Sequence, residues 1–170
     1  MKYNIRLAIK EDVKNLSKLK QLVWDETYRG IYDDDIIDNF DYTKSENSFQ
    51  GIIDNASISL YVVESEDELV GYMSVGVPVR KFADYNQEIG LLYLRKDFQH
   101  QGIGRKLFNM GYNEIKNNGY ANFFISCNKY NMKAREFYEK MGGKLIHEDE
   151  DIGNKRYIQA KYHYDIKGNR

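Results

Sequence analysis

An apolar segment followed closely by a long amphipathic helix constrains the fold of this 170-residue chain most strongly. Residues 88–94 are mostly apolar, as in a buried strand, and residues 102–118 carry hydrophobic side chains at spacings of three and four. A similar pair follows: an apolar strand at 123–127 and a helix that begins after Asn131, a residue type favoured at the N-cap. The two pairs predict a mixed α/β fold of the α+β type, with strand 123–127 inside the sheet.

The remaining segments predict helices near the N-terminus and antiparallel strands around the two pairs. Glu11 and Asp12 open an amphipathic helix that closes at Gly30, and residues 65–68 are typical of a hairpin turn. The other expected helical segments are Asp34–Phe40 and Ser45–Asp54, and the other expected strands are 3–8, 58–64, 69–77, 144–147 and 157–164. No linker, repeat or low-complexity stretch divides the sequence, so we expect a single domain over residues 1–170.

Composition and charge exclude several classes of protein. With 42% hydrophobic residues, 30% charged residues and a formal net charge of -1, the chain is globular and gives no reason to expect nucleic acid as a partner. Its one cysteine, Cys127, excludes an internal disulfide, and its three histidines lie far apart, so we expect no metal site. The N-terminus lacks a signal peptide's apolar core, and no run reaches the roughly 18 apolar residues of a membrane span. We therefore expect a cytoplasmic protein without a membrane partner.

The loop before the helix at 102–118 is a candidate anion site. The first N–H groups of a helix have no partner within it and lie at the positive end of its dipole. Gly102 and Gly104 let the backbone approach a phosphate, and Arg105 and Lys106 add positive charge. The loop lacks the third glycine and the later acid of a dinucleotide fingerprint, and it lacks the Gly-Lys-Ser/Thr of a P-loop. A Gly-x-Gly pair can also start a helix without binding anything, so both interpretations stay open at this point.

Three motifs resemble the GCN5-related N-acetyltransferase (GNAT) superfamily, in particular its small bacterial members. The loop resembles the family's Gln/Arg-x-x-Gly-x-Gly/Ala, and residues 88–94 resemble its strand Glu-Leu-x-x-Leu-Tyr-Val. The pattern Asn-x-x-Ala-x-x-Phe-Tyr-Glu-Lys-x-Gly is met by Asn131, Ala134, Phe137, Tyr138, Glu139, Lys140 and Gly142. The resemblance is strong over residues 87–143. One departure is Gly143, where the family usually has phenylalanine.

This resemblance implies a fold and a cofactor. The fold is a mostly antiparallel mixed sheet of six to seven strands with helices on both faces, splayed between two parallel central strands. The cofactor is acetyl-CoA, with its diphosphate on the glycine loop and its pantetheine arm beside the strand. The implied cofactor-binding residues are Leu92, Tyr93, Leu94, Gln99, Gln101, Gly102, Ile103, Gly104, Arg105, Lys106, Asn131 and Tyr138.

Acetyl transfer to an amine needs a base and a proton donor. An alkylamine has a pKa near 10.4, so only about one in a thousand is neutral at pH 7 and a carboxylate that takes the proton helps. By resemblance Glu88 is the candidate base and the Tyr138 hydroxyl the candidate donor to the leaving thiolate, while a backbone N–H near 92–94 would stabilise the oxyanion. The plainer interpretations are a solvated strand-end charge for Glu88 and a core aromatic ring for Tyr138. Cys127 lies in an apolar strand without a nearby histidine, which favours direct transfer in a ternary complex.

The residues that bind the acceptor are less clearly indicated than those that bind the cofactor. The segment that contains Trp24 and Tyr28 resembles small family members that include polyamine acetylases, so these two residues are candidate substrate-binding residues. Nearby acids could attract a cationic amine or could simply form a solvated face: Asp25, Glu26, Asp33, Asp34 and Asp35. We expect an N-acetyltransferase whose primary amine acceptor is a small molecule, a polyamine or a protein amine, and which can form a homodimer. The alternatives are a catalytically weak acyl-CoA sensor of the same fold and a nucleotide-binding domain.

Overall fold

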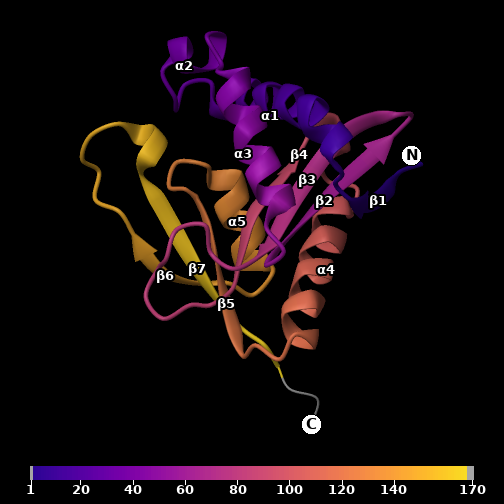
Figure 1. Cartoon of the computed structure of the whole chain (residues 1–170). Helices are drawn as coiled ribbons and strands as arrows, with labels where there is room; N and C mark the ends of the chain where they lie inside the picture. Colours follow the sequence, from indigo (N-terminus) through magenta and orange to yellow (C-terminus); the bar gives the residue numbers. More distant parts are fainter. Residues whose placement is uncertain (1, 168–170) are drawn as a thin grey trace.

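A seven-stranded sheet organises the computed structural model, which describes residues 2–167 (Figure 1). The strand order is β1-β2-β3-β4-β5-β7-β6, and every neighbouring pair except β4–β5 is antiparallel. The strands are β1 (Asn4–Leu7), β2 (Ile58–Ser65), β3 (Glu68–Gly76), β4 (Glu88–Leu94), β5 (Asn122–Asn128), β6 (Lys144–Glu148) and β7 (Gln159–Asp165). The expected mixed, mostly antiparallel sheet with an internal strand at 123–127 is confirmed.

Helices cover both faces of the sheet and leave part of one face to a loop. The helices are α1 (Val13–Tyr28), α2 (Asp34–Asp38), α3 (Tyr42–Asp54), α4 (Ile103–Asn117) and α5 (Met132–Lys140). One core lies under α1 and α3 against β2 and β3, and another lies between α4, α5 and the opposite face. On the α1 face, Phe82 and Tyr85 from the loop between β3 and β4 pack against Phe124 of β5.

The two parallel central strands pair over a short distance and then separate. Strand β4 pairs with β5 at Glu88↔Phe124 and Ile89↔Ile125. On its other side β4 pairs with β3 along its length, with an irregularity at Gly90 between the pairs of Ile89 and Leu91. A β-bulge bends the strand that carries it, so β4 turns away from β5 beyond Ile89. The predicted splay between the central strands is confirmed.

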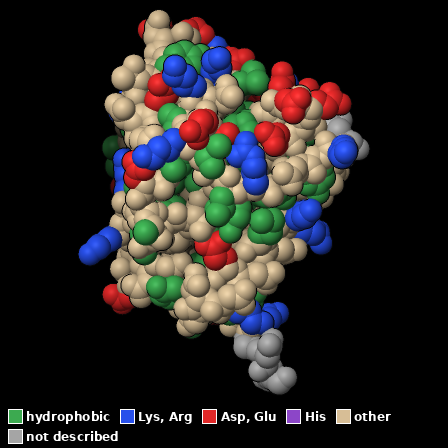
Figure 2. All heavy atoms as spheres, turned by 45° about the vertical axis from the view of Figure 1, so that its right-hand side comes forward, with side chains coloured by type: hydrophobic (Ala, Val, Ile, Leu, Met, Phe, Trp, Pro, Cys, Tyr) green, Lys and Arg blue, Asp and Glu red, His purple; other side chains and the backbone are tan. Residues whose placement is uncertain are grey.

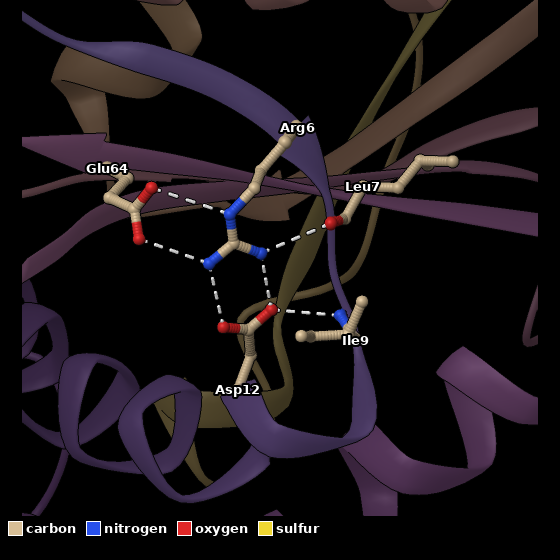
Figure 3. A network of polar contacts seen from close by, with 5 residues as sticks. All are labelled: Arg6, Leu7, Ile9, Asp12 and Glu64. Carbon is tan, nitrogen blue, oxygen red and sulfur yellow. Dashed lines mark hydrogen bonds and ion pairs between the residues drawn. The ribbon is translucent and has the colours of Figure 1, made fainter. Parts of the chain in front are cut away.

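An arginine network ties the first helix to the edge of the sheet (Figure 3). The Arg6 guanidinium donates to both carboxylate oxygens of Asp12, at 2.7 and 2.9 Å, and to Glu64 at 3.1 Å. Asp12 also accepts a hydrogen bond from the Ile9 N–H at 2.8 Å. The hydrogen bonds from Arg6 hold the pKa of the Asp12 carboxyl below its usual value. These bonds fix where the chain leaves β1 and enters α1.

Several element boundaries differ from the sequence-based expectation, including the end of α2, which lies at Asp38 and not at the expected Phe40. Three of the differences have a clear local reason. The first helix begins at Val13 because Lys10–Asp12 form a 3₁₀ turn. Helix α3 begins at Tyr42, before the expected Ser45, because the Asp41 carboxylate caps it by accepting from Lys44 N–H at 2.9 Å. The last strand begins at Gln159 because Lys155–Tyr157 form another 3₁₀ turn. Residues 65–68 form the expected hairpin turn between β2 and β3.

The surface has no dominant charge on the side that Figure 2 shows. Basic and acidic side chains are interspersed there, with hydrophobic side chains scattered between them (Figure 2). Within residues 2–167, no helix is both long and apolar enough to cross a bilayer. The same residues contain no group of three or more His, Cys, Asp or Glu side chains arranged to hold a metal ion.

Candidate active site

A cleft of about 610 Å³ opens where β4 and β5 separate. Its walls come from the end of α1, the second half of β4, the loop at 96–105 and the first turns of α5. Most of the predicted cofactor-binding residues line it: Leu92, Tyr93, Leu94, Gln99, Gly102, Gly104, Arg105, Asn131 and Tyr138. Segments far apart in the sequence therefore meet in one site, as the motifs predict.

Three predicted cofactor-binding residues make other contacts. The Ile103 side chain is 1% exposed and belongs to the core under α4. Gln101 donates its side-chain amide to the Asp97 carbonyl at 2.8 Å, and the Lys106 ammonium lies 5.2 Å from the ring centroid of Tyr3. None of these three residues lines the cleft.

The glycine loop has the backbone geometry of an anion site. His100 and Gly102 adopt left-handed conformations, with φ of 59° and 80°, and such alternation turns successive N–H groups toward one point. Gly102 is the N-cap of α4 and has no side chain to accept the N–H groups of the first turn. The Gln99 amide braces the loop by donating to the Leu94 carbonyl at 3.0 Å. Free donors, a helix N-terminus and Arg105 together fit a diphosphate.

Tyr138 lines the cleft from α5, and a hydrogen bond to β7 anchors its main chain. Asn131 caps α5 by accepting from Ala134 N–H at 3.2 Å, which confirms the capping role expected for Asn131. The Tyr138 carbonyl accepts from the Tyr164 hydroxyl at 2.6 Å, and the Tyr138 side chain lines the cleft. Burial raises the pKa of the Tyr138 hydroxyl well above its usual value, so it stays protonated and can donate.

The same packing explains the glycine at position 143. A Cβ there would lie 2.6 Å from the Tyr164 hydroxyl and 2.9 Å from the Tyr138 carbonyl. A phenylalanine at this position would displace the hydrogen bond that supports Tyr138. Gly143 is therefore required by Tyr164 in this chain.

Glu88 lies at the closed end of the split and does not line the cleft. Its Oε1 accepts from Val79 N–H at 2.9 Å and lies 3.0 Å from where a Cβ on Gly90 would be, so the carboxylate lies over the bulge of β4. Burial raises the pKa of Glu88, while the Val79 N–H and the Lys161 ammonium lower it. A carboxyl with a raised pKa next to the strand separation has the chemistry of a proton acceptor.

Lys161 is a neighbour of this carboxylate that sequence reasoning missed. It lies on β7 opposite Ser126 of β5 and donates to the Ser126 hydroxyl at 2.8 Å. Burial lowers the pKa of Lys161 and outweighs the opposing effects of Asp149 and Glu88. The contact depends on the pairing of two strands that are distant in sequence. The only sequence signal for it was the alternation of polar and apolar residues within 159–165, which predicts a strand and not its partner.

The candidate acceptor residues Trp24 and Tyr28 lie beside the cleft and do not line it. Tyr28 is 2% exposed, stacks on Tyr32 and places its hydroxyl 3.2 Å from that of Tyr93. Trp24 packs edge to face with Tyr32 and Phe40. These rings form one aromatic layer between α1, α2 and the split.

The thiol of Cys127 is a packed core group. It is 8% exposed, and burial raises its pKa to about 12. A thiol held protonated in this way is a poor nucleophile. The geometry therefore agrees with the sequence-based interpretation of Cys127.

Comparisons with known proteins agree with the fold. Residues 23–155 match the family described as "Acetyltransferase (GNAT) domain", which is well over half of the chain. The chain is 26% identical to the spermidine N(1)-acetyltransferase of Thermoplasma acidophilum over 167 residues, covering 95% of this chain and 99% of that protein.

Solved structures share the fold over nearly the whole chain. The PaiA N-acetyltransferase of Thermoplasma acidophilum, in complex with coenzyme A, superposes with a TM-score of 0.78 at 22% identity, covering 97% of this chain and 99% of that one. YncA from Salmonella typhimurium, with its cofactor acetyl-CoA, gives 0.73 at 18% identity, covering 98% and 95%. The matched family, together with the cleft that contains its motifs, shows that this chain belongs to the GNAT family of acetyltransferases.

Proposed function

We propose that this chain is an acetyl-CoA-dependent N-acetyltransferase of primary amines that works as one domain. The observation that carries the proposal is the left-handed, side-chain-free N-cap at Gly102, which lines the same cleft as Tyr138. The PaiA and YncA structures hold coenzyme A and acetyl-CoA, respectively, in the same fold, which supports the same cofactor here. One sheet takes strands from both ends of the chain, which supports a single domain.

Different residues of the cleft bind different parts of the coenzyme. The loop N–H groups at 102–105 and the Arg105 side chain bind the diphosphate. Beyond Ile89 the β4 edge that faces β5 has no strand partner among residues 2–167, so its main chain can pair with the pantetheine arm. Acetyl-CoA supplies an acetyl group activated as a thioester.

Two side chains carry out the proton transfers of the reaction. Glu88 takes a proton from the acceptor amine, directly or through water, because its raised pKa brings it nearer to neutral pH than an ordinary carboxyl. Tyr138 donates a proton to the leaving thiolate, whose intrinsic pKa is about 8.5. Because Cys127 is protonated and buried, the acetyl group passes directly to the amine in a ternary complex.

Titration calorimetry with coenzyme A, followed by thiol release from acetyl-CoA over a panel of primary amines, tests this proposal. We expect coenzyme binding and acceptor-dependent thiol release. Binding without release for every amine would instead support the acyl-CoA sensor, and absence of binding would refute both.

A further inference from the structure

We propose that the acceptor amine also carries a carboxylate, as an amino acid does, and that Arg156 with Lys20 recognises it. This inference rests on the proposed function and names its substrate class. Arg156 lies in the 3₁₀ turn Lys155–Tyr157, just before β7. It is placed beside the split because Asn128, the last residue of β5, donates to the carbonyls of Lys155 at 2.7 Å and Arg156 at 3.2 Å.

The Arg156 guanidinium lies on the aromatic layer of the acceptor side. Its central carbon is 4.9 Å from the ring centroid of Trp24 and 5.8 Å from that of Tyr32. Tyr32 stacks on Tyr28 at 4.2 Å, and the Tyr28 hydroxyl contacts Tyr93 in the cleft wall. A continuous set of rings therefore connects Arg156 to the cleft.

Arg156 has no anionic partner within residues 2–167. Its side chain forms no ion pair and donates no hydrogen bond there, and its contacts are with aromatic rings. A guanidinium held against aromatic rings keeps its N–H groups available for the two parallel hydrogen bonds that a carboxylate accepts. The Arg156 donors are thus available for a planar anion.

A second unpaired cation lies on the same indole ring. The Lys20 ammonium is 5.2 Å from the Trp24 centroid and 5.6 Å from that of Phe49, and it too has no ion pair in the described part of the chain. Burial, and then repulsion from Arg156 and Lys44, lower the pKa of Lys20. Uncompensated like charges are destabilising, and an anion bound near both cations would relieve that repulsion.

The neighbouring acids that could attract a polyamine are largely engaged. Arg29 forms ion pairs with Asp25 at 2.7 Å, with Asp34 at 3.1 Å and with Asp38. The Glu26 carboxylate accepts from Lys96 N–H at 2.8 Å. Asp33 and Asp35 are exposed. The charged groups that contact the Trp24 ring itself are the cations Arg156 and Lys20, which disfavour a polycation at that ring.

A buried hydroxyl under the same rings also lacks a partner. Tyr72 is 0% exposed, its hydroxyl has no hydrogen-bond partner among residues 2–167, and its electrostatic neighbours are Tyr28 and Tyr32. Unpaired buried hydroxyls are rare because each costs about 1–3 kcal/mol.

The test compares matched acceptors in wild-type and variant enzyme. Tyrosine with tyramine, and lysine with cadaverine, differ only by the carboxylate, and spermidine represents polyamines. We expect Arg156→Gln to lower kcat/KM for the amino acids about 10- to 100-fold while leaving tyramine and cadaverine nearly unchanged. Lys20→Met should act in the same direction, whereas Lys18→Gln, which removes an exposed charge from the same helix, should have no effect.

The outcomes separate this inference from the proposed function. If spermidine, tyramine and cadaverine are acetylated at least as well as the amino acids, or Arg156→Gln lowers activity equally for acids and amines, the carboxylate site is wrong and the acetyltransferase stands. If no acceptor releases thiol although coenzyme A binds, the proposed function fails and the inference fails with it. Equal melting temperatures of Arg156→Gln and wild type show that a selective loss is not due to unfolding.

Discussion

The Tyr28 hydroxyl lies 3.2 Å from the Tyr93 hydroxyl, which joins the last residue of α1 to β4 inside the cleft wall. Burial raises the pKa of both hydroxyls above the usual value, so both are protonated and one donates to the other. We expect Tyr28→Phe to lower the free energy of unfolding by about 1–2 kcal/mol, because it leaves the Tyr93 hydroxyl buried and unpaired. Urea denaturation measures the change.

Tyr93→Phe and the double variant complete this experiment. If the two hydroxyls stabilise the fold through each other, the double variant loses less than the sum of the single variants. Strict additivity would show that the 3.2 Å contact contributes no coupling energy.

Tyr138→Phe should separate chemistry from binding. It keeps the buried ring and the carbonyl contact to Tyr164, and removes the hydroxyl that is proposed to donate to the thiolate. We expect kcat to fall about 100-fold or more, as for loss of a general acid, while the coenzyme A dissociation constant changes little. Unchanged turnover would remove Tyr138 from its proposed role.

Gly102 and Gly119 offer a matched pair at the two ends of one helix. Both have a left-handed backbone, with φ of 80° and 83°, and a Cβ on either would meet no atom within 4 Å. We therefore expect alanine at each to cost about 1–2 kcal/mol of stability through backbone strain alone. Only Gly102→Ala should also weaken coenzyme A binding in titration calorimetry, because only Gly102 lines the cleft. Equal coenzyme affinity in the two variants would argue against the loop as the diphosphate site.

Local signals predicted the parts of this molecule that depend on local chemistry. Strand β4 has the expected bounds, Asn131 caps α5, and Gly119 and Gly142 end their helices with positive φ. The sequence analysis did not predict the helix cap at Asp41 or the 3₁₀ turn at 155–157, although aspartate is a favoured cap residue. The partners of Glu88 and the stacking of Arg156 on Trp24 could not be predicted, since they require β5, β7 and α1 to meet in space. The motifs thus predicted most of the residues that line the cleft and left the acceptor side undefined.

Asp12→Asn should destabilise the protein near neutral pH by about 2 kcal/mol, because Asp12 is largely buried and accepts two hydrogen bonds from Arg6. The folded-state pKa of Asp12 lies below its unfolded value. Its contribution is therefore complete above the unfolded pKa and is lost as pH falls through the folded pKa. Denaturation curves of the two proteins should converge in acid. Asp54→Asn, which breaks an exposed pair with Lys10 at 3.6 Å, is the control and should change stability little at either pH.

Lys161 should influence the pH at which the rate falls on the acid side of the pH–rate profile (the acid limb), because it affects the pKa of Glu88. The base must be deprotonated, so the rate falls as pH drops through the pKa of Glu88, which burial raises and Lys161 lowers. Lys161→Met should therefore move this limb to higher pH, and Lys161→Arg should restore it. Among the other charged groups, Arg80 and Asp149 act on Lys161 and stay in place in both variants.

Glu88→Gln tests whether the limb belongs to this carboxylate. We expect it to lower kcat about 100-fold and to abolish the limb, since no proton acceptor remains at that position. If the acid limb persists in Glu88→Gln, or keeps its position in Lys161→Met, the titration belongs to another group. Because the acceptor's own amine titrates at higher pH, the alkaline side of the profile should be the same in all variants, and that constancy distinguishes a shifted base from a changed acceptor.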